Sequence, residues 1–173
     1  ICSLLYRVAA LVLALATAGL AQEYPAKPVR LIVPFPPGGS NDIVGRMIAT
    51  QLGERWGKQV VVDNRGGAGG VIGTDLAAKA PPDGYTLFVA SMGLTTNPYL
   101  YSDNKRDAVK DFTPLSIVVT QPLLVVVNNN VPVKSMAELV TYAKAQKQPL
   151  QYTTGGIGSY GHLWWEMVRA QQG

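Results

Sequence analysis

Three short apolar segments of this chain each run into a loop that contains glycine, and each loop is followed by a helix-like pattern. The loops comprise residues 35–39, 66–70 and 154–158. An alternation of strands with amphipathic helices is typical of a mostly parallel sheet that is covered by helices. This order therefore predicts an α/β fold with helical connections between its strands.

The first half of the chain carries the clearest patterns. Apolar runs predict strands over residues 29–34, 59–63 and 85–90. Ser40 has the side chain of a helix N-cap, and a shorter helix is expected over residues 74–80. The helix that follows Ser40 has apolar residues at helical spacing, namely Ile43, Val44, Met47, Ile48, Leu52 and Trp56.

A capping box marks the clearest helix of the second half. Ser135 is followed three residues later by Glu138, and this pair predicts a helix over residues 136–145. The other elements expected here are a crossover into a second lobe through the apolar runs 115–120 and 123–127, a strand over residues 150–153, and a helix that begins near Ser159.

The N-terminal residues match a secretory signal peptide. Arg7 precedes the apolar run 8–16, and the small residues 17–21 follow it. We expect cleavage after Ala21 and a periplasmic location for the remaining chain; a retained membrane anchor is the alternative. The chain then divides into a signal peptide (1–21), a first α/β lobe (22–118) and the start of a second, incomplete α/β lobe (119–173).

Composition excludes several classes of site. The chain carries 15 Lys and Arg against 11 Asp and Glu, and the basic residues are scattered, which argues against a nucleic-acid partner. Cys2 is the only cysteine and lies within the signal segment, so disulfides and thiolate sites are not expected. His162 is the only histidine, which rules out histidine clusters for metal. We expect neither a metal nor a cofactor.

The three glycine-containing loops share a physical property. Glycine permits close backbone approach, and the helix that follows presents unpaired N–H groups and the positive end of its dipole. In open parallel sheets ligands bind beyond the carboxyl ends of the strands, where these loops lie. Two such loops from separate lobes predict a facing pair suited to an anion, although glycines can also serve tight turns alone.

Similar-looking enzyme motifs fail on spacing. The glycines from Gly67 to Gly73 follow a strand, but their spacing differs by one residue from a dinucleotide fingerprint and no acid closes the next strand. No loop ends in the Gly-Lys-Ser/Thr of a phosphate-binding loop. Ile157 stands where a nucleophile elbow around Ser159 needs its first glycine. An exported hydrolase that uses Ser159 or Ser40 with His162 is therefore only the alternative hypothesis.

Polar side chains near the loops have two interpretations each. His162 could donate to a bound carboxylate or pack against Trp165. Asp42 could be a favourable acid of the first helical turn or a pocket residue. Arg65 could pair with a ligand carboxylate, but an ion pair with Asp63 or Asp83 is favoured. Trp164 and Trp165 cannot both face inward, so one of them is a candidate to cover the cleft.

With these loops in view, the sequence resembles the Bug-type (TctC-like) extracytoplasmic receptors of tripartite tricarboxylate transporters. The resemblance covers essentially the whole chain after residue 21, in register. The matching segments are Tyr24-Pro25, residues 27–30, 33–39 with Asp42, 61–65, 67–70, 78–80, 82–87, Asn97-Pro98, 110–112, 156–159 and His162-Leu163.

This resemblance implies a type II periplasmic binding protein-like (Venus-flytrap) fold of two Rossmann-like lobes, the second truncated here. It implies a receptor, not an enzyme, that captures a small carboxylate (an organic acid or acidic amino acid) and delivers it to a membrane permease. The ligand-binding residues carried over from the loops are Phe35, Pro37, Gly38, Gly39, Ser40, Asp42, Gly67, Ala68, Ser91, Gly93, Thr154, Gly156, Gly158, Ser159 and His162.

Overall fold

The computed structural model of the chain describes residues 23–102 and 106–172. The predicted signal peptide, residues 1–21, lies outside these ranges, and Cys2 lies outside them with it. Within these ranges, no helix has the length and apolar character that crossing a membrane requires. The signal peptide and the lobe boundaries therefore stay predictions.

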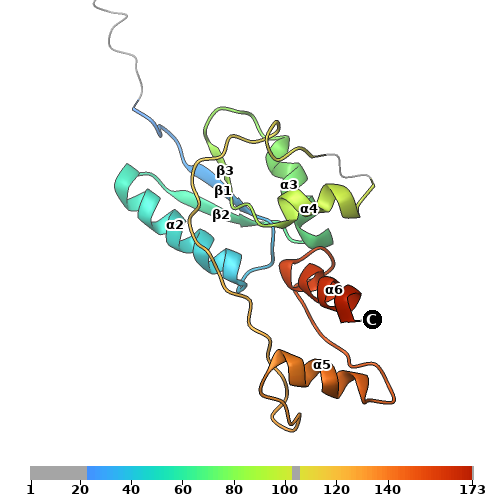
Figure 1. The fold of residues 1–173 in the computed structure, drawn as a ribbon. Coiled ribbons are helices and arrows are strands. Elements are labelled where there is room, and N and C mark those ends of the chain that lie inside the picture. The colour runs from blue at the N-terminus through green and yellow to red at the C-terminus, as the bar shows by residue number, and fades with distance from the viewer. Residues whose placement is uncertain (1–22, 103–105, 173) are drawn as a thin grey trace, which may run out of the picture.

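One parallel sheet organises the first half of the chain. It contains β1 (Val29–Val33), β2 (Val60–Asn64) and β3 (Thr86–Phe88) in the order β2-β1-β3 (Figure 1). The central strand ends before Pro34, whose ring nitrogen has no N–H to continue a ladder. The parallel sheet with its connecting helices confirms the predicted α/β class.

β1 is the most deeply buried strand. Leu31 lies opposite Val62 of β2 and opposite Leu87 of β3. Val29 and Ile32 have no exposed surface. Strands that are covered on both faces are rich in apolar residues, and β1 follows this pattern except at Arg30, which is only partly buried.

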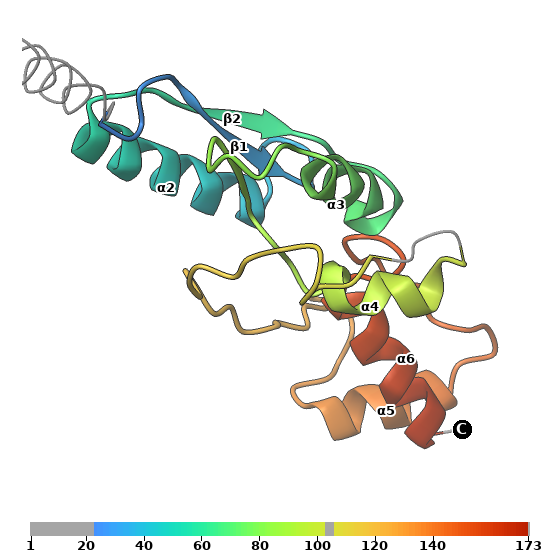
Figure 2. The same cartoon turned by 90° about the horizontal axis from the view of Figure 1, so that it is seen from above.

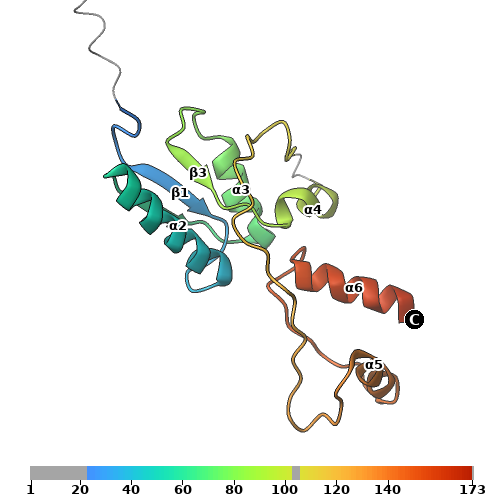
Figure 3. The same cartoon turned by 60° about the vertical axis from the view of Figure 1, so that its left-hand side comes forward.

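Helices cover both sides of this sheet. α2 lies on one side of the strands and α3 on the other (Figures 1 and 3), as right-handed crossovers to opposite edges of a sheet require. We call the region from β1 to α4 the N-terminal unit. Its helical segments are α2 (Ser40–Trp56), the short 3₁₀ turn η1 (Ala68–Gly70), α3 (Val71–Ala78) and α4 (Gly93–Leu100).

Close packing of α2 on the sheet forms the core. Ala49 joins Val29, Leu31 and Val60 in one buried cluster. Gly45 lets the helix approach β1, because a Cβ at this position would lie 2.8 Å from a methyl group of the strand. The apolar stripe of α2 is wider than this contact, so the predicted core-facing residues at its outer edge, Ile43 and Met47, are exposed.

Two helices form the C-terminal unit, which we define as residues 136–172. α5 (Met136–Lys144) and α6 (Tyr160–Gln172) lie apart from the sheet, and α4 lies between the sheet and α6 (Figure 2). The predicted capping box is present: Ser135 Oγ accepts from the N–H of Glu138 at 3.2 Å. The Glu138 carboxylate accepts in return from the N–H of Lys134 at 2.7 Å.

One prediction about the second half was wrong, because residues 150–153 do not form a strand. The apolar runs 115–120 and 123–127, which were expected as a crossover, do not pair in a sheet. Ile117 and Val126 are each 85% exposed. A strand needs a neighbour for its N–H and C=O groups, and the described residues supply none at these positions.

Smaller differences concern helix starts. α2 has Gly39, not Ser40, as its N-cap, and no side chain caps it. α3 begins at Val71, three residues before the predicted start. The sequence analysis missed α4, because Pro98 within it is a helix-breaking signal.

Replacing glycines in α2 and α3 with alanine tests this packing. In α3, a Cβ at Gly73 would lie 2.7 Å from the carbonyl oxygen of Arg65 and 2.7 Å from Cα of Pro34. Backbone atoms cannot yield as a side chain can, so Gly73→Ala is expected to lower the free energy of unfolding by about 1–3 kcal/mol. Urea denaturation followed by circular dichroism measures this change.

Gly53 of α2 provides the matched control. The nearest atom to a Cβ there is the carbonyl oxygen of Lys58 at 3.4 Å, which is ordinary contact. Gly53→Ala is therefore expected to stabilise the chain by up to about 1 kcal/mol through helix propensity. Equal effects of the two substitutions would contradict the packing described for α3.

Candidate functional site

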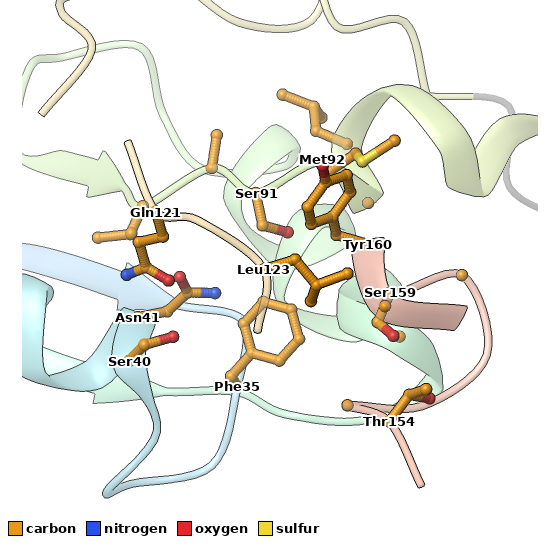
Figure 4. A pocket seen from close by; sticks show the side chains of 18 of the residues that line it. Phe35, Ser40, Asn41, Ser91, Met92, Gln121, Leu123, Thr154, Ser159 and Tyr160 are labelled. Atoms are coloured by element: carbon orange, nitrogen blue, oxygen red, sulfur yellow. The ribbon is translucent and has the colours of Figure 1, made fainter. Parts of the chain in front are cut away.

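A large open cavity of about 2080 Å³ lies between the two units. Figure 4 shows side chains from distant parts of the sequence that point into it. Phe35, Ser40 and Ser91 come from the carboxyl ends of strands and the loops that follow them, and Thr154 and Ser159 come from the C-terminal unit. The cavity therefore brings together loops that lie more than 100 residues apart.

Three helices begin at the wall of this cavity. α2 lines it with Ser40 and Asn41, α4 with Gly93 and Leu94, and α6 with Tyr160. Neither α2 nor α4 has a side-chain hydrogen bond at its N-cap. Free N–H groups and the positive ends of helix dipoles favour a bound anion. α2 offers such groups most directly, because the first amides of α4 donate to the carbonyl oxygens of Ser91 and Met92, and Ser159 caps α6.

Asp42 fixes the first of these loops. Its carboxylate accepts from the N–H of Gly38 at 2.8 Å, from Nε of Arg46 at 3.0 Å and from Nδ2 of Asn64 at 2.9 Å. The same amide of Asn64 donates to the carbonyl oxygen of Phe35 at 3.1 Å. Asp42 is buried and does not line the cavity, which matches its interpretation as an acid of the first helical turn.

These contacts determine the protonation of Asp42. Hydrogen bonds from Arg46, from the backbone of Gly38 and from Asn64 lower the pKa of the carboxyl group to about 2. The carboxylate is therefore ionised throughout the physiological pH range, and all of its contacts hold the loop between β1 and α2.

Local hydrogen bonds close the glycine-containing loop of the C-terminal unit, residues 154–158. Thr154 Oγ1 accepts from the N–H of Gly156 at 3.3 Å, and the N–H of Ser159 donates to the carbonyl oxygen of Gly156 at 3.1 Å. Ser159 Oγ accepts from the N–H of His162 at 3.3 Å and so caps α6. Gly158 has a φ of +81°, which glycine adopts without strain.

The imidazole of His162 faces its own helix and loop. Nδ1 accepts from the N–H of Gly158 at 3.4 Å, and Nε2 lies 4.0 Å from Oε1 of Glu166. Among the described residues, neither Ser40 nor Ser159 hydrogen-bonds to this imidazole, so the hydrolase alternative is not favoured. His162 does not line the cavity.

The structure distinguishes between the two interpretations of Arg65 and between the two tryptophans. Arg65 pairs with Asp63 at 2.8 Å, which confirms the favoured interpretation of an ion pair. Burial of Asp63 opposes its ionisation, but hydrogen bonds from Arg30 and Arg65 outweigh burial and lower the pKa of its carboxyl group. Trp165 lines the cavity and Trp164 does not.

Seven of the fifteen predicted ligand-binding residues line the cavity wall. They are Phe35, Ser40, Ser91, Gly93, Thr154, Gly158 and Ser159. The other eight do not line it, and they are Pro37, Gly38, Gly39, Asp42, Gly67, Ala68, Gly156 and His162. Whether any of them binds a ligand stays a prediction.

The sequence analysis missed several residues of the wall. Asn41 could have been found, because a polar residue directly after Ser40 belongs to the same first helical turn. Gln121 and Leu123 gave no such signal, because they lie between and within apolar runs that only the tertiary structure brings to the cavity. Within residues 23–102 and 106–172, no group of three or more His, Cys, Asp or Glu side chains could hold a metal ion.

Comparison with known proteins identifies related chains. The family model described as "Tripartite tricarboxylate transporter family receptor" matches residues 44–173. Protein BugT of Bordetella pertussis is 39% identical over 170 residues, which cover 92% of this chain and 51% of BugT. The chain thus spans about half the length of the curated relatives it matches.

Solved structures show the same fold. "R. palustris Rpa4515 with adipate" is 37% identical with a TM-score of 0.81, and the match covers 87% of this chain and 50% of that one. The periplasmic binding protein BugD is 34% identical with a TM-score of 0.72, covering 86% and 50%. These similarities support the periplasmic binding protein-like α/β fold that the sequence predicted.

Lowering the pH tests the role of Asp42. Its folded-state pKa of about 2 lies below the value of about 3.9 in an unfolded chain. Its contribution to stability is therefore present above pH 4 and is lost as the pH falls towards 2. Asp42→Asn is expected to reduce stability near neutral pH, and its urea midpoint is expected to approach that of the wild type below pH 3.

Glu54 offers a control on the same helix. Its side chain is exposed, so Glu54→Gln is expected to follow the wild-type pH dependence. A constant difference between Asp42→Asn and the wild type from pH 7 to pH 2.5 would contradict the assigned contacts.

Proposed function

The chain belongs to the tripartite tricarboxylate transporter receptor family, and on this premise we propose that it is a periplasmic solute-binding receptor that captures a small carboxylate. The observation that carries the proposal is the convergence of the N-termini of α2, α4 and α6 on one cavity. A carboxylate is the group that such N–H-rich, positively polarised surfaces favour.

The walls of the cavity favour a ligand with a hydrocarbon segment. Phe35, Leu123 and Trp165 present apolar surface between the polar groups of the helix starts. A dicarboxylate with a short aliphatic chain has matching chemistry, since its ends are anionic and its middle is apolar. The related Rpa4515 is described with adipate, which is such a molecule.

Family membership also supports a partner and a location. Receptors of this family act outside the cytoplasm and serve a transporter, so we propose a membrane permease as the partner and the periplasm as the location. The N-terminal pattern of residues 1–21 agrees with export. The chain is proposed to deliver its ligand unchanged and to catalyse no reaction on it.

Ligand-dependent stabilisation tests this function. Adipate and glutamate are added to the purified chain, and thermal unfolding is followed by circular dichroism. A ligand at 100 times its dissociation constant is expected to stabilise the folded state by about 2.7 kcal/mol. The control is 1,6-hexanediol, which keeps the chain of adipate but has no charge. The proposal would be refuted if neither adipate nor glutamate stabilises the chain, or if the diol stabilises it as much as adipate does.

A charge placed in the cavity tests the location of the site. Ser91 lines the wall in the loop between β3 and α4. Ser91→Asp introduces a negative charge beside the proposed carboxylate position, and we expect the dissociation constant for adipate to rise at least about tenfold through like-charge repulsion. Isothermal titration calorimetry measures it.

Thr95→Asp is the matched control. Thr95 is exposed on α4 and does not line the cavity, so the same change of charge is expected to leave the dissociation constant within about twofold, because solvent screens it. An unchanged affinity in Ser91→Asp would place the ligand elsewhere.

A further inference from the structure

Asn97 of α4 is one of three buried polar side chains among residues 23–102 and 106–172. Only 1% of its surface is exposed. Its Nδ2 donates to the carbonyl oxygen of Gly69 at 3.0 Å, which joins α4 to the loop that precedes α3. The neighbouring Thr96 reaches the other unit, because its Oγ1 donates to the carbonyl oxygen of Gly158 at 3.4 Å.

Three glycines from both units close around this amide. A Cβ at Gly158 would lie 2.8 Å from Oδ1 of Asn97, and a Cβ at Gly93 would lie 3.0 Å from its Nδ2. A Cβ at Gly69 would lie 2.5 Å from the carbonyl oxygen of Ile157. Any side chain at these positions would push the two loops apart, so glycine permits a direct contact between the units at Asn97.

One atom of the amide is unsatisfied. Oδ1 of Asn97 is buried and has no hydrogen-bond partner among the described residues. A buried acceptor without a donor carries an energetic cost, which a nearby N–H can remove. The residue beside Oδ1 is Gly158, whose own N–H makes only a long bond of 3.4 Å to Nδ1 of His162.

We propose that Asn97 is the positioning residue of the binding site: it holds loop 66–70 through Gly69 and accepts the N–H of Gly158 when loop 154–159 closes on a bound carboxylate. This proposal rests on the proposed function. Asn97 lies one turn into α4, whose N-terminus lines the cavity, and it touches the glycine that directly precedes the N-cap of α6. The amide thereby sets the separation of two of the three helix N-termini.

Hydrogen exchange without ligand tests the contact itself. Asn97→Ala is expected to speed amide exchange in peptides that cover residues 154–163, measured by mass spectrometry. The matched control is Thr74→Val. Thr74 is also buried, and its Oγ1 donates to the carbonyl oxygen of Gly70 in the same loop, but it makes no contact with residues 154–159. Thr74→Val is expected to leave exchange in residues 154–163 unchanged.

Ligand affinity tests the positioning role. Asn97→Ala is expected to raise the dissociation constant for adipate about tenfold, the usual cost of one hydrogen bond, and Thr74→Val to change it less than about twofold. If Asn97→Ala and Thr74→Val have equal effects on hydrogen exchange in residues 154–163 and on the dissociation constant, Asn97 only stabilises the fold in general. That result would overturn the proposal. If the wild type binds no carboxylate, the proposed function fails, and the exchange result still decides whether Asn97 joins the loops.

A second variant alters the contact between Asn97 and Gly158 on the side of the C-terminal unit. Gly158→Ala places a Cβ against Oδ1 of Asn97 and is expected to speed exchange in residues 66–70, across the contact. Gly155→Ala lies in the same loop as Gly158, and its nearest neighbour is Ser159 at 3.6 Å; it is expected to leave residues 66–70 unchanged. Unchanged exchange in residues 66–70 for Gly158→Ala would overturn the proposal even if Asn97→Ala does not fold.

Discussion

Parallel pairing of β1 with both of its neighbours is the constraint on which the site depends. Because β1, β2 and β3 run in one direction, their carboxyl ends meet at one edge of the sheet. The helices that follow must begin there, and α2 and α4 consequently present their N-termini to the same space. The position of these two helix N-termini is thus a result of strand direction, and the cationic side chains of Lys144 and Arg169 also line the wall.

Hydrogen bonds behind the wall give this arrangement its shape. Asp42 and Asn64 hold the loop after β1 through main-chain groups of Gly38 and Phe35. Asn97 joins α4 to the loop that precedes α3 in the same way, through the carbonyl group of Gly69. None of these three side chains lines the cavity. These polar side chains thus fix the backbone of the loops around the cavity.

The segment between the two units is less enclosed than the N-terminal unit. Ile117 and Val126 are largely exposed, and the apolar runs that contain them form no sheet among the described residues. Apolar β-branched residues favour strands only where a neighbouring strand satisfies their backbone and covers their side chains.

The sequence alone determined the features that depend on neighbouring residues. The burial of β1, the capping box at Ser135 and the start of α6 after Ser159 were predictable, because strand and helix periodicity and caps are local. Only the tertiary structure decided that Thr96 hydrogen-bonds to Gly158 of the other unit and that Gln121 lines the cavity. These roles depend on distances between segments that lie far apart in the chain, and no local sequence pattern encodes such distances. They also depend on the hydrogen-bond partners that each backbone group meets once the strands have paired.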